Sequence, residues 1–134
     1  MIIRVIEFLA FAACGLLLVG TAFQLGLSAG APWAAAAYGG RAAQSDGRLP
    51  GRYRAASLAT AVVLVAIGWL LLLRGGVVGS ASENSALAVA CWAFAALFAV
   101  NTLGNLAGRH PLERWGMGAL TASLTVLCVL LALG

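Results

Sequence analysis

The chain has 134 residues, of which 63% are hydrophobic and only 9% charged, and its mean hydropathy is +1.01. Soluble domains carry about 25% charged residues, so this composition excludes an ordinary soluble protein and indicates an integral membrane protein. The net charge is +4, but the arginines flank apolar runs, as membrane topology requires, and therefore do not indicate nucleic-acid binding.

Four uncharged runs follow one another along the chain, at residues 8–40, 55–73, 84–108 and 115–134. A helix of about 20 residues crosses the hydrocarbon core, and strand-like alternation is absent, which disfavours a β-barrel. We therefore predict one membrane domain, residues 1–134, with an all-α fold: a four-transmembrane-helix bundle with spans over about 6–28, 55–73, 85–107 and 115–133.

The first run resembles a secretory signal peptide, since Arg4 precedes an apolar stretch that ends in small residues at positions 29–31. Against cleavage, Glu7 lies near the start, the apolar stretch is too long, and Pro32 follows the small residues directly. We expect this segment to be retained as the first span.

The stretch APWAAAAYGG, residues 31–40, is apolar sequence left over after a complete first span. Pro32 suits a first helical turn, the alanines favour helix, and Gly39-Gly40 can end it, which predicts a short helix at the membrane interface. Such a helix would be the lid of a polar pocket at that end of the bundle. A re-entrant segment that dips toward Gln24 is the alternative. Three aromatic residues are expected to act as interfacial anchors: Trp33, Tyr38 and Trp115.

The arginines are distributed unevenly between the two sides of the bundle. Arg4 and Arg74 lie on one side, and six lie in the connections on the other: Arg41, Arg48, Arg52, Arg54, Arg109 and Arg114. Because cytoplasmic loops hold the excess of positive charge, we predict a multi-pass protein of the bacterial plasma (inner) membrane. Loops 1-2 and 3-4 are then cytoplasmic and both termini lie outside.

Polar and small residues form two stripes at the same end of the predicted bundle. Asn101, Gly104, Asn105 and Gly108 follow helical spacing in the third span, and Thr21, Gln24 and Ser28 do so in the first. In the structural interpretation, the amides make interhelical hydrogen bonds, and four glycines allow close packing of helices: Gly26, Gly30, Gly104 and Gly108.

In the functional interpretation, the same stripes form a small polar pocket open to the cytoplasm, made by Gln24, Ser28, Asn101 and Asn105. Arginines at its rim would hold an anionic headgroup or solute, and the candidates are Arg52, Arg54, Arg109 and Arg114.

Titratable side chains predict no catalytic, metal or cofactor site. Cys14, Cys91 and Cys128 fall inside spans without a Cys-x-x-Cys pair, and we expect them to be small apolar core residues. His110 and Glu113 lie in HPLERW at the start of the fourth span, where Glu113 is expected to cap the helix.

Glu7 is expected at the outer interface, paired with Arg4 or Arg74, with proton coupling as the alternative.

Several short motifs resemble an uncharacterised family of small bacterial four-span membrane proteins. They are Pro32-Trp33 with Gly39-Gly40, Leu49-Pro50 followed by Arg54 and Ser57, and Asn101 with Glu113-Arg114-Trp115. The sequence departs from that pattern at Ala34, where Gly is expected, and at residues 116–118, where Pro is expected. The resemblance implies a four-helix fold and no particular biochemical activity.

These observations predict a non-enzymatic helix bundle in the lipid bilayer that acts through self-association, as a homo-oligomer, or through another membrane protein. The alternative is a small-solute transporter or channel, or a lipid-headgroup binder, that uses the cytoplasm-facing polar pocket.

Overall fold

The computed structural model describes residues 1–134 and contains no strands. Its four long helices are α1 (Ile2–Ala29), α2 (Gly51–Arg74), α3 (Ser85–Leu106) and α4 (Gly118–Leu133). A π-helical turn, η3 (Leu112–Met117), leads into α4, and two 3₁₀ turns follow α1, η1 (Ala34–Ala36) and η2 (Tyr38–Gly40). Four helical segments are long and apolar enough to cross a membrane. The predicted all-α, four-helix architecture is confirmed, and the chain is a multi-pass membrane protein.

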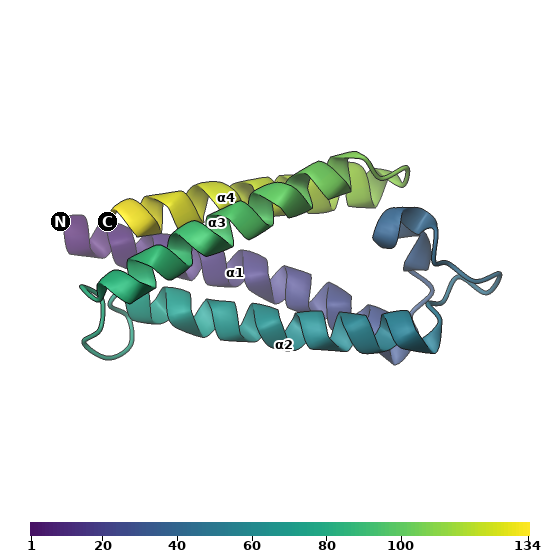
Figure 1. Ribbon diagram of the computed structural model, residues 1–134, viewed down its shortest axis with the longest axis horizontal. Helices are drawn as coiled ribbons and strands as arrows, with labels where there is room; N and C mark the ends of the chain where they lie inside the picture. The colour runs from purple at the N-terminus through teal and green to yellow at the C-terminus, as the bar shows by residue number, and fades with distance from the viewer.

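The helices form two antiparallel hairpins, with α1 beside α2 and α3 beside α4 (Figure 1). One end of the bundle, the terminal end, holds both chain termini and the connection at residues 75–84. The other, the connection end, holds residues 30–50 and 107–111. The hairpins lie close together at the terminal end and separate toward the connection end, where residues 34–40 fold back into the space between them (Figure 1).

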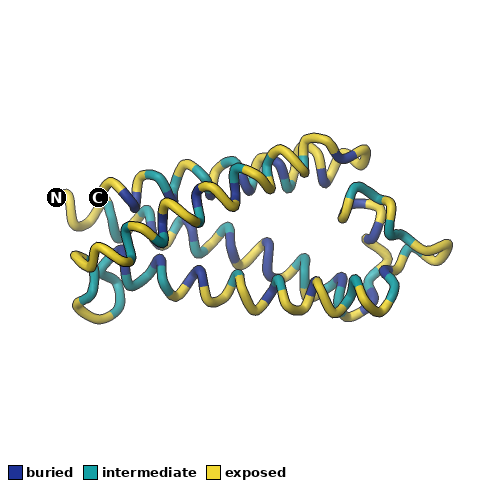
Figure 2. Tube along the Cα trace, viewed as in Figure 1, coloured by how far each residue is buried: buried dark blue, intermediate teal, exposed yellow.

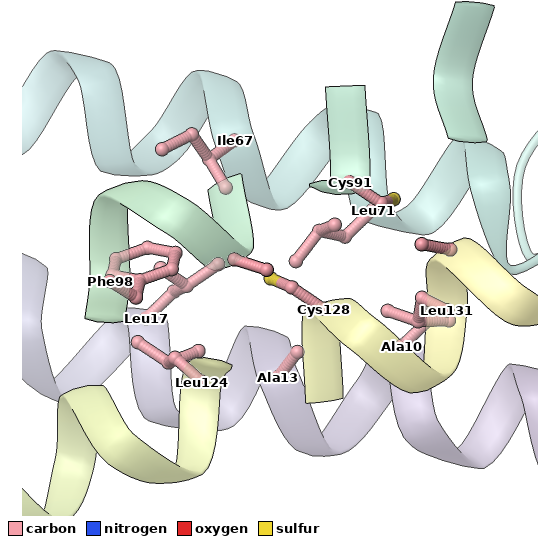
Figure 3. Close-up of a cluster of buried hydrophobic side chains, with 12 residues drawn as sticks. Ala10, Ala13, Leu17, Ile67, Leu71, Cys91, Phe98, Leu124, Cys128 and Leu131 are labelled. Atoms are coloured by element: carbon pink, nitrogen blue, oxygen red, sulfur yellow. The ribbon is translucent and has the colours of Figure 1, made fainter. Parts of the chain in front are cut away.

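The main hydrophobic core fills the terminal half of the bundle, where side chains from all four helices meet (Figure 3). Buried positions lie on the inner sides of the helices, and exposed positions cover the outside (Figure 2). The core consists of Ala10, Ala13, Leu17, Ile67, Leu71, Cys91, Ala95, Phe98, Leu124, Cys128, Leu131 and Ala132. All four helices are therefore held together at this end, while the other end depends on different contacts.

A second, smaller cluster lies at the connection end. Leu27 and Leu49 pack there with Ala34 and Ala37 from the segment that follows α1. This cluster fixes residues 31–50 against the first hairpin.

Three helices begin earlier than their predicted spans: α1 begins at Ile2, α2 at Gly51, and the fourth helical segment at Leu112. The prediction used charge-free runs, but Arg52 and Arg54 are themselves helical. Arginine favours helix nearly as well as leucine does, so a helix continues through residues that a hydropathy boundary leaves out.

The segment at residues 31–40 is helical as predicted, but its helix is divided. Ala37 is extended, with φ −134° and ψ 152°, and separates η1 from η2. Tyr38 has φ 52°, followed by Gly39 at 70° and Gly40 at 76°. The left-handed backbone turns the chain sharply here, which glycine tolerates and a side chain such as that of Tyr38 rarely does.

Arg74, at the end of α2, is only 9% exposed and its guanidinium binds backbone carbonyls. Its Nε donates to the carbonyl of Leu131 over 2.9 Å, its Nη2 to that of Ala132 over 3.2 Å, and its Nη1 to that of Ser82. The last carbonyls of a helix have no partner within the helix, so Arg74 caps α4 rather than pairing with Glu7.

We expect Arg74→Leu to destabilise the bundle, because it leaves carbonyls of α4 without donors where water is scarce. The loss should be about 1–3 kcal/mol, measured by equilibrium unfolding of the purified protein in mixed micelles. Arg4→Leu, an exposed arginine at the same end, is the matched control and should change stability little. Equal stability of the two variants would contradict the capping role.

Candidate functional site: a cavity between the two hairpins

A cavity of about 520 Å³ lies where the hairpins separate, and all four helices and the segment after α1 contribute to its wall. Its polar lining consists of Gln24, Tyr38, Thr60, Asn101, Asn105, Glu113 and Thr121. The rest is mainly apolar: Leu17, Gly20, Phe23, Ala36, Ala37, Gly39, Leu64, Phe98, Val100, Gly104, Met117, Leu120 and Leu124. The cavity is therefore amphipathic.

The α3 side of the cavity is exposed. Val100, Asn101 and Gly104 line the cavity and are also exposed on the surface of the protein. Beside them, α2 and α3 approach each other near the terminal end and then diverge (Figure 1). In a bilayer, this opening faces the lipid rather than an aqueous compartment.

Residues 31–40, called the lid below, close the connection end of the cavity. The hydroxyl of Tyr38 lies 3.0 Å from Ser57 Oγ on α2, and its ring meets that of Tyr53 edge to face at 5.1 Å. The N–H of Gly39 donates to Glu113 Oε1 in η3 over 2.9 Å. The lid is thus joined to both hairpins.

Glu113 is only 5% exposed, and its carboxylate faces the lid rather than the start of its own helix. Oε1 accepts the Gly39 N–H, whereas Oε2 is buried without a partner. A side chain at Gly108 would overlap this carboxylate. The expected capping by Glu113 is therefore wrong: His110 Nδ1 accepts the N–H of Leu112 over 3.1 Å and makes that local contact instead.

Gln24 on α1 also lines the cavity, and its Oε1 is likewise buried without a hydrogen-bond partner. These two oxygens are the buried side-chain polar atoms of the chain that have no hydrogen-bond partner. Both belong to residues that line the same cavity, and both are acceptors. Native structures leave few buried polar groups unsatisfied, so this pair marks the cavity as a candidate binding site.

Asn105 behaves as the structural interpretation predicts. Its Nδ2 donates to Thr121 Oγ1 over 3.2 Å, which joins α3 to α4. Thr102 Oγ1 donates to the same hydroxyl over 3.0 Å. Asn101 lies on the cavity wall one turn earlier and is exposed.

Ser28, the fourth predicted pocket residue, is not part of the cavity lining. Its hydroxyl donates to the carbonyl of Leu25 in its own helix, and its own carbonyl accepts Arg54 Nε over 2.9 Å. Arg54 therefore caps the end of α1, as Arg74 caps α4.

The other arginines predicted at the rim do not form one group. Arg52 lies over the Tyr53 ring at 5.1 Å, and Arg114 over the Trp115 ring at 5.0 Å. Arg109 lines a second depression of about 460 Å³ on the outer side of the lid. The depression is shared by Ala35, Gly39, Gly40, Arg41, Arg109, His110 and Pro111.

Three of the four glycines predicted to pack helices together face groups of the same chain. A side chain at Gly26 would overlap the Trp33 ring, and a Cβ at Gly30 would lie 3.3 Å from Nη2 of Arg54. Gly108 faces Glu113, as described above. Gly104 has no atom within 4 Å of an added Cβ and lies on the cavity wall.

The predicted anchors lie at the connection end with exposed rings, Trp33 at 45%, Tyr38 at 39% and Trp115 at 63%. Trp33 also stacks on Phe23, with ring centroids 5.9 Å apart and planes 6° from parallel. The sequence predicted residues 31–40 as a lid beside the pocket, but not the contacts of Tyr38 and Glu113 that hold this lid closed. The one usable signal was an acidic residue at the start of an otherwise apolar span.

No protein-family model matches the chain, and comparison with curated proteins and with solved structures found no match either. The fold and the site define a small multi-pass membrane protein with an amphipathic cavity.

We expect Gly26→Ala to destabilise the connection end, because the added methyl would push the Trp33 ring off Phe23. Forcing such a repacking costs about 1–3 kcal/mol, measurable by unfolding in mixed micelles. Gly15→Ala, in the same helix with no atom within 4 Å of the new Cβ, should be neutral or slightly stabilising. Equal free energies of unfolding for the two variants would contradict the contact between the Trp33 ring and Gly26.

Proposed function

We propose that the chain is a non-enzymatic membrane protein that binds a small amphipathic molecule in the cavity between its hairpins. The observation that carries this proposal is the pair of buried oxygens without partners, Gln24 Oε1 and Glu113 Oε2, on residues of one cavity wall. A bound molecule with a polar group would offset the cost of leaving them unsatisfied, which is about 1–3 kcal/mol per group.

The size and lining of the cavity support this function. Small-molecule sites have volumes of about 300–1,000 Å³ and are mostly apolar, with a few polar groups that fix the orientation of the ligand. At about 520 Å³, with polar residues on α1, α3, α4 and the lid, the cavity meets both conditions. Its exposed α3 side supports entry from the bilayer.

Binding, or carriage with movement of the lid, fits this arrangement better than a channel does. The buried core fills the terminal half of the bundle and would interrupt a continuous pore. Release toward the connection end would require the lid to separate from Glu113 and Ser57, the groups that hold it. A carrier therefore needs only a local movement of residues 31–40.

Self-association or a membrane partner, the first prediction from the sequence, has less support from this geometry. Gly26, Gly30 and Gly108 face groups of their own chain. Gly104 alone in that set borders open space, where a second copy could also pack.

The binding proposal is tested by filling the cavity with Gly104→Phe. We expect wild-type protein in nanodiscs to bind Nile red, a neutral apolar dye, with a saturable blue-shifted fluorescence. Gly104→Phe should weaken that binding at least about tenfold, because the added ring removes cavity volume and ligand contacts worth more than 1.4 kcal/mol. Gly15→Phe is the matched control, because Gly15 is also helical with open space but lies outside the cavity.

Equal loss in both variants, or no saturable component in the wild type, would contradict a binding cavity. The oligomeric size of each variant is measured in the same preparations. A change of size confined to Gly104→Phe would assign the effect to a partner copy and favour self-association.

We further propose that the protein lies in a bacterial plasma membrane with the connection end cytoplasmic and both termini outside, as the six-to-two distribution of arginines supports. Alkaline phosphatase fused after Gly134 should then be active and green fluorescent protein fused there should be dark. Fusions at Ser45, in the connection between α1 and α2, should give the opposite pattern. The reverse result would invert the topology.

A further inference from the structure

Resting on the proposed binding function, we propose that the ligand is an amphipathic organic cation, such as a lipophilic ammonium or phosphonium ion. Glu113 would neutralise its charge, Gln24 would orient it, and its apolar groups would occupy the rest of the cavity.

The charge of Glu113 is the first argument. An ionised carboxylate accepts hydrogen bonds at about four lone-pair positions, and this carboxylate receives one, from the neutral Gly39 N–H. A carboxylate taken out of water without a partner is strongly disfavoured. It is also the acidic residue of the cavity lining, so a positive charge inside the cavity would interact with it directly.

The arginines at this end do not supply that positive charge. Arg54 caps α1, and Arg52 and Arg114 lie over aromatic rings. Arg41 and Arg109 line the depression on the outer side of the lid, and Arg48 is exposed in the connection between α1 and α2. The missing partner of Glu113 is therefore expected from outside the chain.

The lining of the cavity also favours a cation over an anion. The carboxylate of Glu113 favours a ligand with donors or positive charge and opposes an anion, whereas the Gln24 amide carries both an acceptor and a donor and can turn either one toward the ligand. Three aromatic residues, Phe23, Tyr38 and Phe98, also contribute to the lining. Aromatic ring faces attract cations, most strongly in desolvated sites.

The charges around the lid favour entry of this cation from the membrane. Arg41 and Arg109 line its outer side, where positive charge would repel a cation that approached from the aqueous compartment. The exposed α3 wall carries no charged side chain among Val100, Asn101 and Gly104. A cation with enough apolar surface to partition into the bilayer can reach the cavity by that route.

Tetraphenylphosphonium and tetraphenylborate, which have the same shape and opposite charge, test the proposal. With wild-type protein in nanodiscs of neutral lipid, tetraphenylphosphonium should displace Nile red saturably, whereas tetraphenylborate should be at least about tenfold weaker. This comparison needs no variant. Equal displacement by the two ions, or stronger displacement by the borate, would overturn the assignment of a cation.

Glu113→Gln then identifies the group responsible. The amide keeps an acceptor for the Gly39 N–H and removes the charge, so the preference for tetraphenylphosphonium over tetraphenylborate should fall at least about tenfold. Glu7→Gln is the matched control, since it removes the same charge from a residue outside the cavity lining, and should bind as the wild type does. An unchanged preference for tetraphenylphosphonium in Glu113→Gln would overturn the role of this carboxylate.

The two proposals fail in different ways. If Nile red binds to the wild type and is lost in Gly104→Phe, but tetraphenylphosphonium does not compete, the cavity binds ligands and the inference of a cation is wrong. If Nile red shows no saturable binding at all, the binding function itself is wrong.

Discussion

The hydrogen bond from the Gly39 N–H to the buried carboxylate of Glu113 links the two hairpins at the end where they diverge (Figure 1). Close packing holds the four helices together only over the terminal half. At the other end the lid takes the place of helix contacts, and this bond joins it to the second hairpin. Several local features accommodate the bond: the left-handed backbone at Gly39, the π-helical turn that carries Glu113, and the missing side chain at Gly108.

Arginine serves a second structural purpose in this bundle. Arg54 donates to a carbonyl in the last turn of α1, and Arg74 donates to two in the last turn of α4. A helix that ends near hydrocarbon has few water molecules available for its last carbonyls, so a guanidinium with five donors is well suited there. This explains why Arg54, predicted at the rim of the pocket, caps a helix instead.

Length and hydropathy were enough to predict the four helices, and helical spacing was enough to bring Gln24, Asn101 and Asn105 to one cavity. Each of those predictions depends on periodicity within a single helix. Ser28 follows the same spacing but lies outside the cavity, because its carbonyl meets Arg54 from another helix. The partner of Glu113 is 74 residues away, so local sequence offered capping as the simpler interpretation. Contacts between the lid and η3 depend on how far the hairpins diverge, which no local pattern specifies.

The cavity is difficult to explain as a purely structural feature. Gly104 lies on the cavity wall with room for a larger side chain, and a side chain that packed against the wall would add van der Waals contacts. Replacing Gln24 and Glu113 with apolar residues would remove two buried acceptors that have no donors. A bundle that acted only through its outer faces would gain stability from both changes. The chain instead combines an unfilled space with a charged group inside it, and a ligand that fills the space and neutralises the charge accounts for both.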